Sequence, residues 1–511
     1  MSRRRLLRLP LVATLAVAGA ARAQADARPS GGLTLSDVVR VTLAGGSRIR
    51  YDAQEVESWK GRVMASSAPF DPRLRTAVTS SRDNQRFALG AAPVWAVQQD
   101  VGYEAGVEKE FRSGIVVSPG VGVTRSATSL AADIPTGSAT AGVRVRVPLM
   151  QNRGGSVSAT AERVAELDYR GNVEDLRHTV ATSLRDAAIA FWSYVGARRR
   201  LDVLTTAEAR AKRLADETEQ LVRADERPAG DMRQLLANLA TKRAARIQAE
   251  QALVQARFAV AEEMGLRPAL AARLPDPATD FPVPPEEADT TEAAAARAAA
   301  AVVERLTTAA LARRADLAAA REKGEASRVE LGEFRSAARP RLDVTVGVGY
   351  TGLESGPGVG RLFTPLYRNV PGLNASVQVS YELPALNAAG RGRVAQGEAF
   401  LEQQAIGREL IERQIGAGVA TAAEGLRRSR QALRESQTAV ALYRETVDNE
   451  KRKFQLGMST LFDVIAAEDA LTNAMLGEIA SQHAYAAAIA SLRFEAGALA
   501  AHDPAGLLTP P

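Results

Sequence analysis

The sequence predicts an α+β membrane protein in which long helical hairpins occur twice and adjoin strands of a transmembrane β-barrel shared between copies of the chain. Three observations predict it: an export signal at the start, two copies of one element order, and a change of hydrophobic period within each copy. The strands are too few for one chain to close a barrel, and the helices are too long for an ordinary globular core.

The first residues have the pattern of an export signal. Four arginines precede an apolar run over residues 9–21 and the small-residue cleavage site Ala21-Arg22-Ala23. A short membrane anchor is the alternative, but Pro10 interrupts the run, and about 20 apolar residues are needed to span a bilayer. We expect residues 1–23 to be a signal peptide. Removing them takes away five arginines and no acidic residue, so the net charge falls from +6 to +1.

The composition excludes several classes of site. There is no cysteine, which excludes disulfides, thiolate zinc sites, cysteine nucleophiles and a lipid anchor on cysteine. After the leader no run of 18 uncharged apolar residues occurs, so any membrane span must consist of strands. Basic and acidic residues alternate along helical stretches without a basic stripe, and we therefore expect no nucleic-acid partner.

The chain contains two copies of one plan. Pro72-Arg73-Leu74 recurs as Pro340-Arg341-Leu342, and Leu43-Ala44 before Ile49 recurs as Leu311-Ala312 before Leu317, both at an offset of 268 residues. Asp231 recurs as Asp463 and Gly265 as Gly497, at an offset of 232 residues. The predicted domains are a first repeat at 24–273, a Pro-rich linker at 274–290 and a second repeat at 291–511.

Each copy is expected to contain a β region before its long helical hairpin. The β regions are predicted at about 73–149 and about 340–384, where apolar residues such as Val344, Val346 and Val348 alternate with small or polar ones. The first region is longer and can hold one additional hairpin that turns at residues 112–114. A half-buried strand of a soluble sheet shows the same alternation, but the export signal and the adjoining helices favour a barrel.

Helical hairpins are predicted at about 153–265 and about 390–497. Apolar residues recur every seven positions at Leu433, Val440, Val447 and Phe454, which is typical of a helix seam. The distances from Pro148 to Asp231 and from Pro384 to Asp463 along the chain predict descending helices of roughly 110 to 120 Å. Four to six strands are fewer than the about eight of the smallest bacterial barrels, so several chains are expected to share one barrel continued by a helical tube.

The segment from Lys453 to Val464 resembles the helix-turn-helix tip of TolC-like outer membrane efflux proteins. It contains an aromatic residue, a glycine three positions later, a hydroxyl cluster and an Asp-aliphatic pair. Leu33-Thr34-Leu35-Ser36-Asp37 resembles the opening of the same family. The resemblance implies a homotrimer with a twelve-stranded barrel, four strands per chain, in the outer-membrane lipid of a Gram-negative bacterium. It also implies a periplasmic α-barrel that docks to a periplasmic adaptor protein and an inner-membrane pump.

The candidate functional site is this helix tip and its counterpart in the first copy. Its residues are Gly457, Ser459, Thr460, Asp463, Asp225, Gly230 and Asp231. Gly457 can adopt a positive φ, and Ser459 or Thr460 can cap the next helix with Asp463 in its first turn. Asp463 is therefore either a capping residue or part of a gate.

In the resembling channels, acidic residues at this tip narrow the entrance. Asp463 matches the first acidic position, Ala466 replaces the second, and Ser459 replaces an arginine found in some members. In the first copy Asp225 occupies the glycine position and Asp231 matches Asp463. The resemblance therefore implies a gate that differs from the best-known ones.

The predicted function is a passive outer-membrane channel for solutes exported by the pump and adaptor, in efflux or type I secretion. The alternative is a periplasmic coiled-coil adaptor or scaffold without a pore. His178, His483 and His502 lack metal-site spacing, and no nucleotide or nucleophile motif occurs. We expect no enzyme activity, metal or cofactor.

Overall fold

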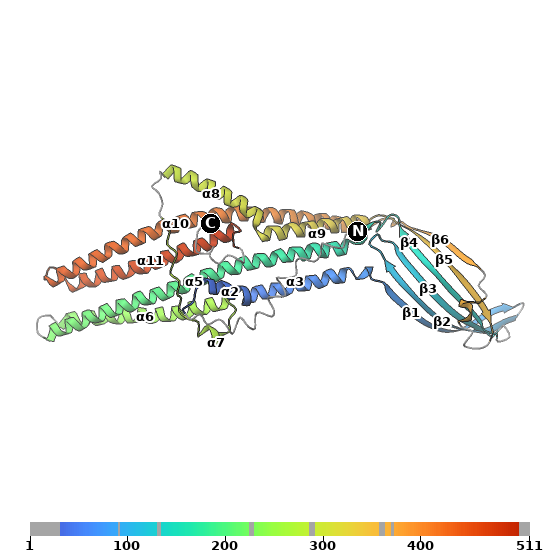
Figure 1. The fold of residues 1–511 in the computed structure, drawn as a ribbon, viewed down its shortest axis with the longest axis horizontal. Helices are drawn as coiled ribbons and strands as arrows, with labels where there is room; N and C mark the ends of the chain where they lie inside the picture. The colour runs from blue at the N-terminus through green and yellow to red at the C-terminus, as the bar shows by residue number, and fades with distance from the viewer. Residues whose placement is uncertain are drawn as a thin grey trace. The chain divides into compact units, whose positions relative to one another are not determined.

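The computed structural model describes residues 31–89, 92–129, 134–223, 229–285, 292–356, 363–368 and 372–499 (Figure 1). The expected signal peptide, Asp225 and His502 lie outside these residues. The predicted α+β class is confirmed: long helices adjoin one antiparallel sheet.

The first half of the chain contains four of the strands. Its elements are α2 (Leu35–Gly45), α3 (Ser47–Ser66), η1 (Ala68–Phe70), β1 (Arg73–Leu89), β2 (Ala92–Glu110), β3 (Val116–Thr128), β4 (Thr136–Pro148), α4 (Gly155–Ser158), α5 (Thr160–Arg223), α6 (Ala229–Glu263) and α7 (Pro268–Ala271). The second half contains α8 (Glu292–Arg313), α9 (Ala315–Ala337), β5 (Arg341–Ser355), η3 (Thr364–Leu366), β6 (Leu373–Glu382), α10 (Ala388–Gln455) and α11 (Leu461–Glu495).

The chain forms two compact units, and each contains segments from both expected repeats. The first comprises the described parts of 1–57, 172–319 and 408–511, and the second comprises 58–171 and 320–407. Helices α3, α5, α9 and α10 each contribute residues to both.

The core of the first unit surrounds Trp192 of α5. Trp192 is fully buried, contacts Phe191 edge-on with ring centroids 5.1 Å apart, and stacks on Phe281 at 5.7 Å. Phe281 belongs to the Pro-rich segment expected to be a linker. That segment also pairs with the start of the chain, because Leu33 donates its backbone N–H to Asp276 at 2.9 Å. Its described part therefore packs into the core.

The predicted helix seam is confirmed. Leu433, Val440 and Val447 of α10 are buried, and the last two pack against Ala467 and Leu471 of α11. Apolar burial on facing sides of two helices holds the hairpin together. Helices α5 and α10 contain 64 and 68 residues, which corresponds to about 96 and 102 Å at 1.5 Å per residue. They are shorter than expected because the chain segments preceding them and the tip turns are not part of the helices.

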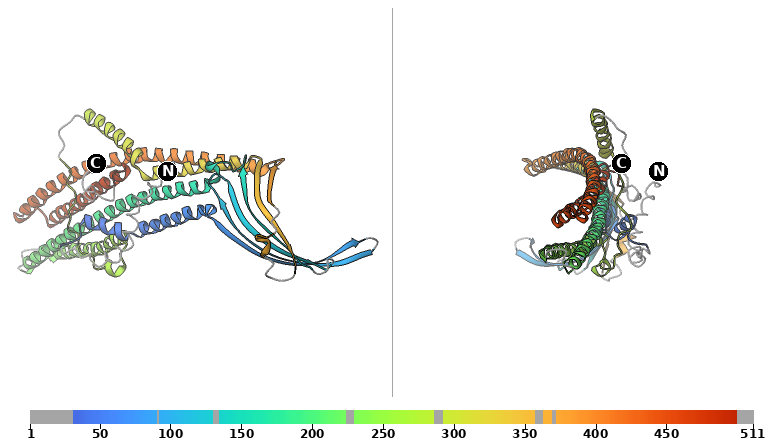
Figure 2. Two further views of the ribbon diagram at one scale, coloured as in Figure 1. Left: turned by 45° about the vertical axis from the view of Figure 1, so that its right-hand side comes forward. Right: turned by 90° about the vertical axis from the view of Figure 1, so that its left-hand side faces the viewer.

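The second unit contains the sheet, with strands in the order β1-β2-β3-β4-β5-β6 and every neighbouring pair antiparallel. As expected, the first β region holds one hairpin more than the second, and a turn at residues 112–114 joins β2 to β3, where Gly114 adopts φ +85°. Among the described residues the sheet has six strands, two more than the four barrel strands per chain that the family resemblance implies. Figure 2 shows the sheet curving as one surface, with the β1–β2 hairpin extending beyond the other strands.

None of the helices within the described ranges is long and apolar enough to cross a membrane.

Candidate functional site

The tip between α10 and α11 is a tight turn closed by backbone hydrogen bonds. The N–H of Met458 donates to the carbonyl of Lys453 at 2.8 Å, and the N–H of Gly457 donates to Phe454 at 3.1 Å. This pair of bonds is a Schellman motif, which requires a left-handed residue after the helix. Gly457 supplies it with φ +74°. The glycine in the sequence pattern therefore has a conformational role.

Thr460 begins α11 through a capping box with Asp463. Its Oγ1 accepts the backbone N–H of Asp463 at 3.3 Å, while Asp463 Oδ2 accepts the Thr460 N–H at 3.0 Å and its hydroxyl at 2.6 Å. These bonds provide acceptors for backbone N–H groups that have no acceptor within the helix, because they lie at its first turn. The Thr460 hydroxyl and then its backbone N–H lower the pKa of Asp463. Asp463 is therefore ionised at neutral pH and has the capping geometry that the sequence allowed.

Ser459 does not cap the helix. Its hydroxyl donates to Glu450 Oε2 of α10 at 2.8 Å, and Glu450 also pairs with Lys453 at 2.5 Å. The hydrogen bonds from Lys453 and then Ser459 lower the pKa of Glu450. A neutral hydroxyl thus joins α10 to the turn at the position where some of the resembling channels have an arginine.

The counterpart in the first copy is described only in part. Gly230 and Asp231 lie in the first turn of α6, and a Cβ built on Gly230 would have open space around it. Asp225 lies outside the described residues, so its site role stays a prediction. The structure does not bring the two groups of predicted residues together in any described contact.

An ionic cluster near the tip, centred on Glu468, was not predicted from the sequence. Glu468 of α11 accepts from Arg210 Nε of α5 at 2.7 Å and pairs with Lys451 Nζ of α10 at 2.6 Å. Burial acts to raise the pKa of Glu468, but the hydrogen bonds and charges of Lys451 and Arg210 outweigh it, so the pKa is lowered. The cluster joins the second helical hairpin to the first.

The sequence contained a signal for this cluster. Glu468 lies four residues after buried Val464 and three before buried Leu471, so it interrupts an apolar stripe. A charged residue in such a stripe normally has an ionic partner.

Glu468→Ala is expected to loosen the contact between the hairpins. Hydrogen bonds to charged groups contribute about 1.5–3 kcal/mol, so we expect a loss of about 2 kcal/mol in local stability. Hydrogen exchange of α11 backbone amides measures it. Glu478→Ala is the matched control, because Glu478 accepts from Gln482 of its own helix. Equal protection in both variants would contradict an ionic link between the hairpins.

The same cluster predicts a pH dependence. Because the folded-state pKa of Glu468 lies below its ordinary value of 4.5, its contribution is fully present above about pH 4.5 and is lost as the pH falls through the lowered pKa.

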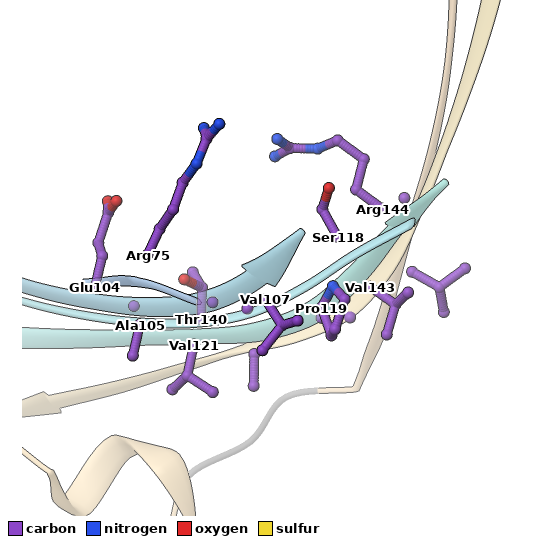
Figure 3. Close-up of a pocket in the computed structure, with 18 of the residues that line it drawn as sticks. Arg75, Glu104, Ala105, Val107, Ser118, Pro119, Val121, Thr140, Val143 and Arg144 are labelled. Atoms are coloured by element: carbon purple, nitrogen blue, oxygen red, sulfur yellow. The ribbon is translucent and has the colours of Figure 1, made fainter. Parts of the chain in front are cut away.

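The second candidate element is the sheet, whose two faces differ in polarity. Along a hollow on the sheet, Arg75, Glu104 and Arg144 point to one side, and Val107, Val121 and Val143 point to the other (Figure 3). The sheet bends toward the polar side (Figure 3). Strand alternation produces two such faces when apolar residues occupy every second position.

The apolar side forms an exposed band across all six strands. Its large side chains are 37 to 76 % exposed: Leu74, Val78, Tyr103, Val107, Val121, Val143, Val346, Val348, Leu373, Val377, Val379 and Tyr381. The η3 segment covers one end of the band, where Leu366 packs on Val123 and Ala139. An apolar surface of this extent indicates contact with lipid or another protein.

A family model described as outer membrane efflux protein matches residues 306–498. The similarity to this family therefore lies in the second half of the chain. The matched region includes β5, β6, α10, α11 and the tip with Asp463.

Solved outer-membrane channels have a fold similar to that of this chain. The outer-membrane channel OprN has 15% identity and a TM-score of 0.67, covering 91% of this chain and 90% of that one. The CmeC outer membrane channel of Campylobacter jejuni has 14% identity and a TM-score of 0.66, covering 91% and 85%. The outer membrane protein VceC of Vibrio cholerae has 15% identity and a TM-score of 0.65, covering 91% and 96%. No curated protein shows significant sequence similarity.

The resemblance to TolC-like outer membrane efflux proteins is thus confirmed. The family description and the matched channels are of outer-membrane proteins, which agrees with the expected outer-membrane location of this chain.

The histidines do not form a metal centre in the described part of the chain. His178 lies 4.0 Å from Asp316, whereas His483 contacts Ser193 Oγ at 3.0 Å, and burial lowers the pKa of His483. No group of three potential ligands converges among the described residues.

Proposed function

We propose that the protein is an outer-membrane channel subunit that passively conducts solutes delivered by an inner-membrane transporter and a periplasmic adaptor. The observation that carries the proposal is the exposed apolar band on a sheet whose edge strands, β1 and β6, each pair with a single neighbour in the described structure. In hydrocarbon, unpaired backbone groups cost several kcal/mol each, so such edges must join another chain. Copies of the chain close the barrel, and its polar face lines the pore.

The helical hairpins support the same function. Two hairpins per chain, each with a descending helix of about 100 Å, extend the pore as a periplasmic tube in a trimer. The ends of α10 and α11 at Asp463 form the entrance on which adaptor and pump act. We expect no catalytic step by this chain, because the driving energy belongs to the transporter.

Fractionation tests the proposal against the adaptor alternative. We expect the full-length protein to be recovered with outer membranes as a detergent-stable trimer. A water-soluble monomer after leader removal would support the coiled-coil scaffold and contradict the channel.

Asp463 is proposed as a gate residue in addition to its capping role, and two substitutions separate the roles. Asp463→Asn retains an oxygen that accepts from Thr460 but removes the charge, whereas Asp463→Ala removes both. A gate role predicts altered cation block in both variants without loss of assembly, measured in planar bilayers. A role in capping alone predicts unchanged conductance in Asp463→Asn and a loss of about 1 kcal/mol in local helix stability in Asp463→Ala.

A further inference from the structure

The β1–β2 hairpin carries a further inference, which rests on the proposed channel function. We infer that this hairpin crosses the membrane as part of the pore wall, so that each chain supplies six strands and three copies close an eighteen-stranded barrel. The alternative is an accessory hairpin lying outside a twelve-stranded barrel.

The apolar band continues without interruption from the hairpin to the other strands. Val78 of β1 is opposite Tyr103 of β2, which is opposite Val123 of β3. Closer to the β2–β3 turn, Leu74 is opposite Val107. A shift of one residue in the pairing would move every side chain of a strand to the opposite face of the sheet. The observed register therefore places the apolar residues of β1 and β2 on the face that is expected to contact lipid.

The polar face continues in the same way. Arg75 of β1 donates to Glu108 of β2 at 3.1 Å, and Figure 3 shows Arg75 and Glu104 on the same side as Arg144 of β4. An accessory hairpin in water would have no need of one apolar and one polar face aligned with those of the barrel strands.

The turn between β2 and β3 is fixed where the helices join the sheet. Arg112 forms a bidentate pair with Glu162 of α5, with both distances 2.6 Å, and its guanidinium lies 4.9 Å from the Phe70 ring. Lys109 donates to the backbone carbonyl of Phe70, which is buried. These contacts hold the turn at the end of the sheet where α3 leads into β1 and β4 leads towards α5.

The pairing of β3 excludes a four-strand contribution. In a barrel of four strands per chain, β3 would be the edge strand and would pair with the next copy. Its edge is already occupied by β2, from Gln98 opposite Thr128 to Glu110 opposite Val116. Among the described strands, the free edges are those of β1 and β6. With six alternating strands these two run in opposite directions, so β6 of one copy can pair antiparallel with β1 of the next.

The strand number sets the pore size. Because barrel diameter grows roughly linearly with strand number, eighteen strands give about 1.5 times the diameter and about twice the cross-section of twelve. Barrels of 16–18 strands leave an aqueous channel. The proposal therefore assigns this protein a wider outer-membrane opening than four strands per chain would give.

Single-cysteine labelling tests the location of the hairpin, because the chain contains no cysteine of its own. A bimane fluorophore is placed at Val78→Cys or Thr79→Cys in β1, and at Val348→Cys in β5 as the control, in the full-length protein in vesicles. We expect spin-labelled lipid to quench positions 78 and 348 alike, and aqueous iodide to quench position 79. Iodide quenching without lipid quenching at position 78 would overturn the inference. Absence of lipid quenching at position 348 as well would instead contradict the proposed channel.

Two further measurements test the strand count. Native mass spectrometry is expected to show an assembly of three chains. A dimer would contribute only twelve strands and would contradict the eighteen-stranded barrel. Deletion of residues 73–115 joins Pro72 to Val116 and leaves four strands, so conductance is expected to fall about twofold in proportion to barrel cross-section. Unchanged conductance would overturn the inference, and if the deletion variant does not assemble, the quenching result decides.

Discussion

Val377→Arg in β6 is expected to remove most of the assembled protein from the membrane. Val377 is 70% exposed in the isolated chain and lies in the apolar band, and an arginine facing the bilayer midplane of a barrel costs about 2–4 kcal/mol. The assembled fraction in urea titrations of protein in lipid vesicles measures the effect.

Gln378→Arg is the matched control, because adjacent residues of a strand point to opposite faces. Gln378 pairs with Thr345 on the polar face, so its replacement by arginine should leave assembly unchanged and alter only ion selectivity. Equal loss in both variants would contradict a lipid-facing band.

Trp192→Ala is expected to destabilise the core of the first unit by about 3–5 kcal/mol, the usual cost of truncating a buried Trp or Phe. Trp192 is fully buried between Phe191 and Phe281, so its loss leaves a cavity and also releases the Pro-rich segment. Limited proteolysis between Leu274 and Pro285, followed by mass spectrometry, measures that release.

Two controls distinguish packing from other effects at Trp192. The Nε1 atom of Trp192 has no hydrogen-bond partner among the described residues, so Trp192→Phe should cost less than Trp192→Ala. Val283→Ala, at an 86% exposed position of the same segment, should leave proteolysis unchanged. Similar cleavage in all three variants would show that Trp192 does not anchor the segment.

The helices and the alternating strands were predictable because both follow from periodic burial. The positions of Val440 and Val447 alone specify which side of α10 faces its partner, and the alternation around Val346 specifies the two faces of β5. Gly457 was predictable for another reason: few residues other than glycine readily adopt the positive φ that the turn requires.

The strand count and the ionic cluster were harder to predict. On β1, Thr76 and Ser80 weaken the apolar alternation, so the register with β2 was needed to show that the band continues. The pairing of Glu468 with Arg210 joins residues 258 positions apart, which no local pattern specifies. The Pro-rich segment has the composition of a linker, yet Phe281 packs on Trp192 through a contact that composition does not reveal.

Single-channel conductance in a planar lipid bilayer tests the central claim most directly, namely that copies of this chain form a pore. We expect the purified full-length protein to produce discrete conductance steps without any other component, and Val377→Arg to abolish them while Gln378→Arg retains them. A purified trimer that inserts into the bilayer and never conducts would contradict a conduit function.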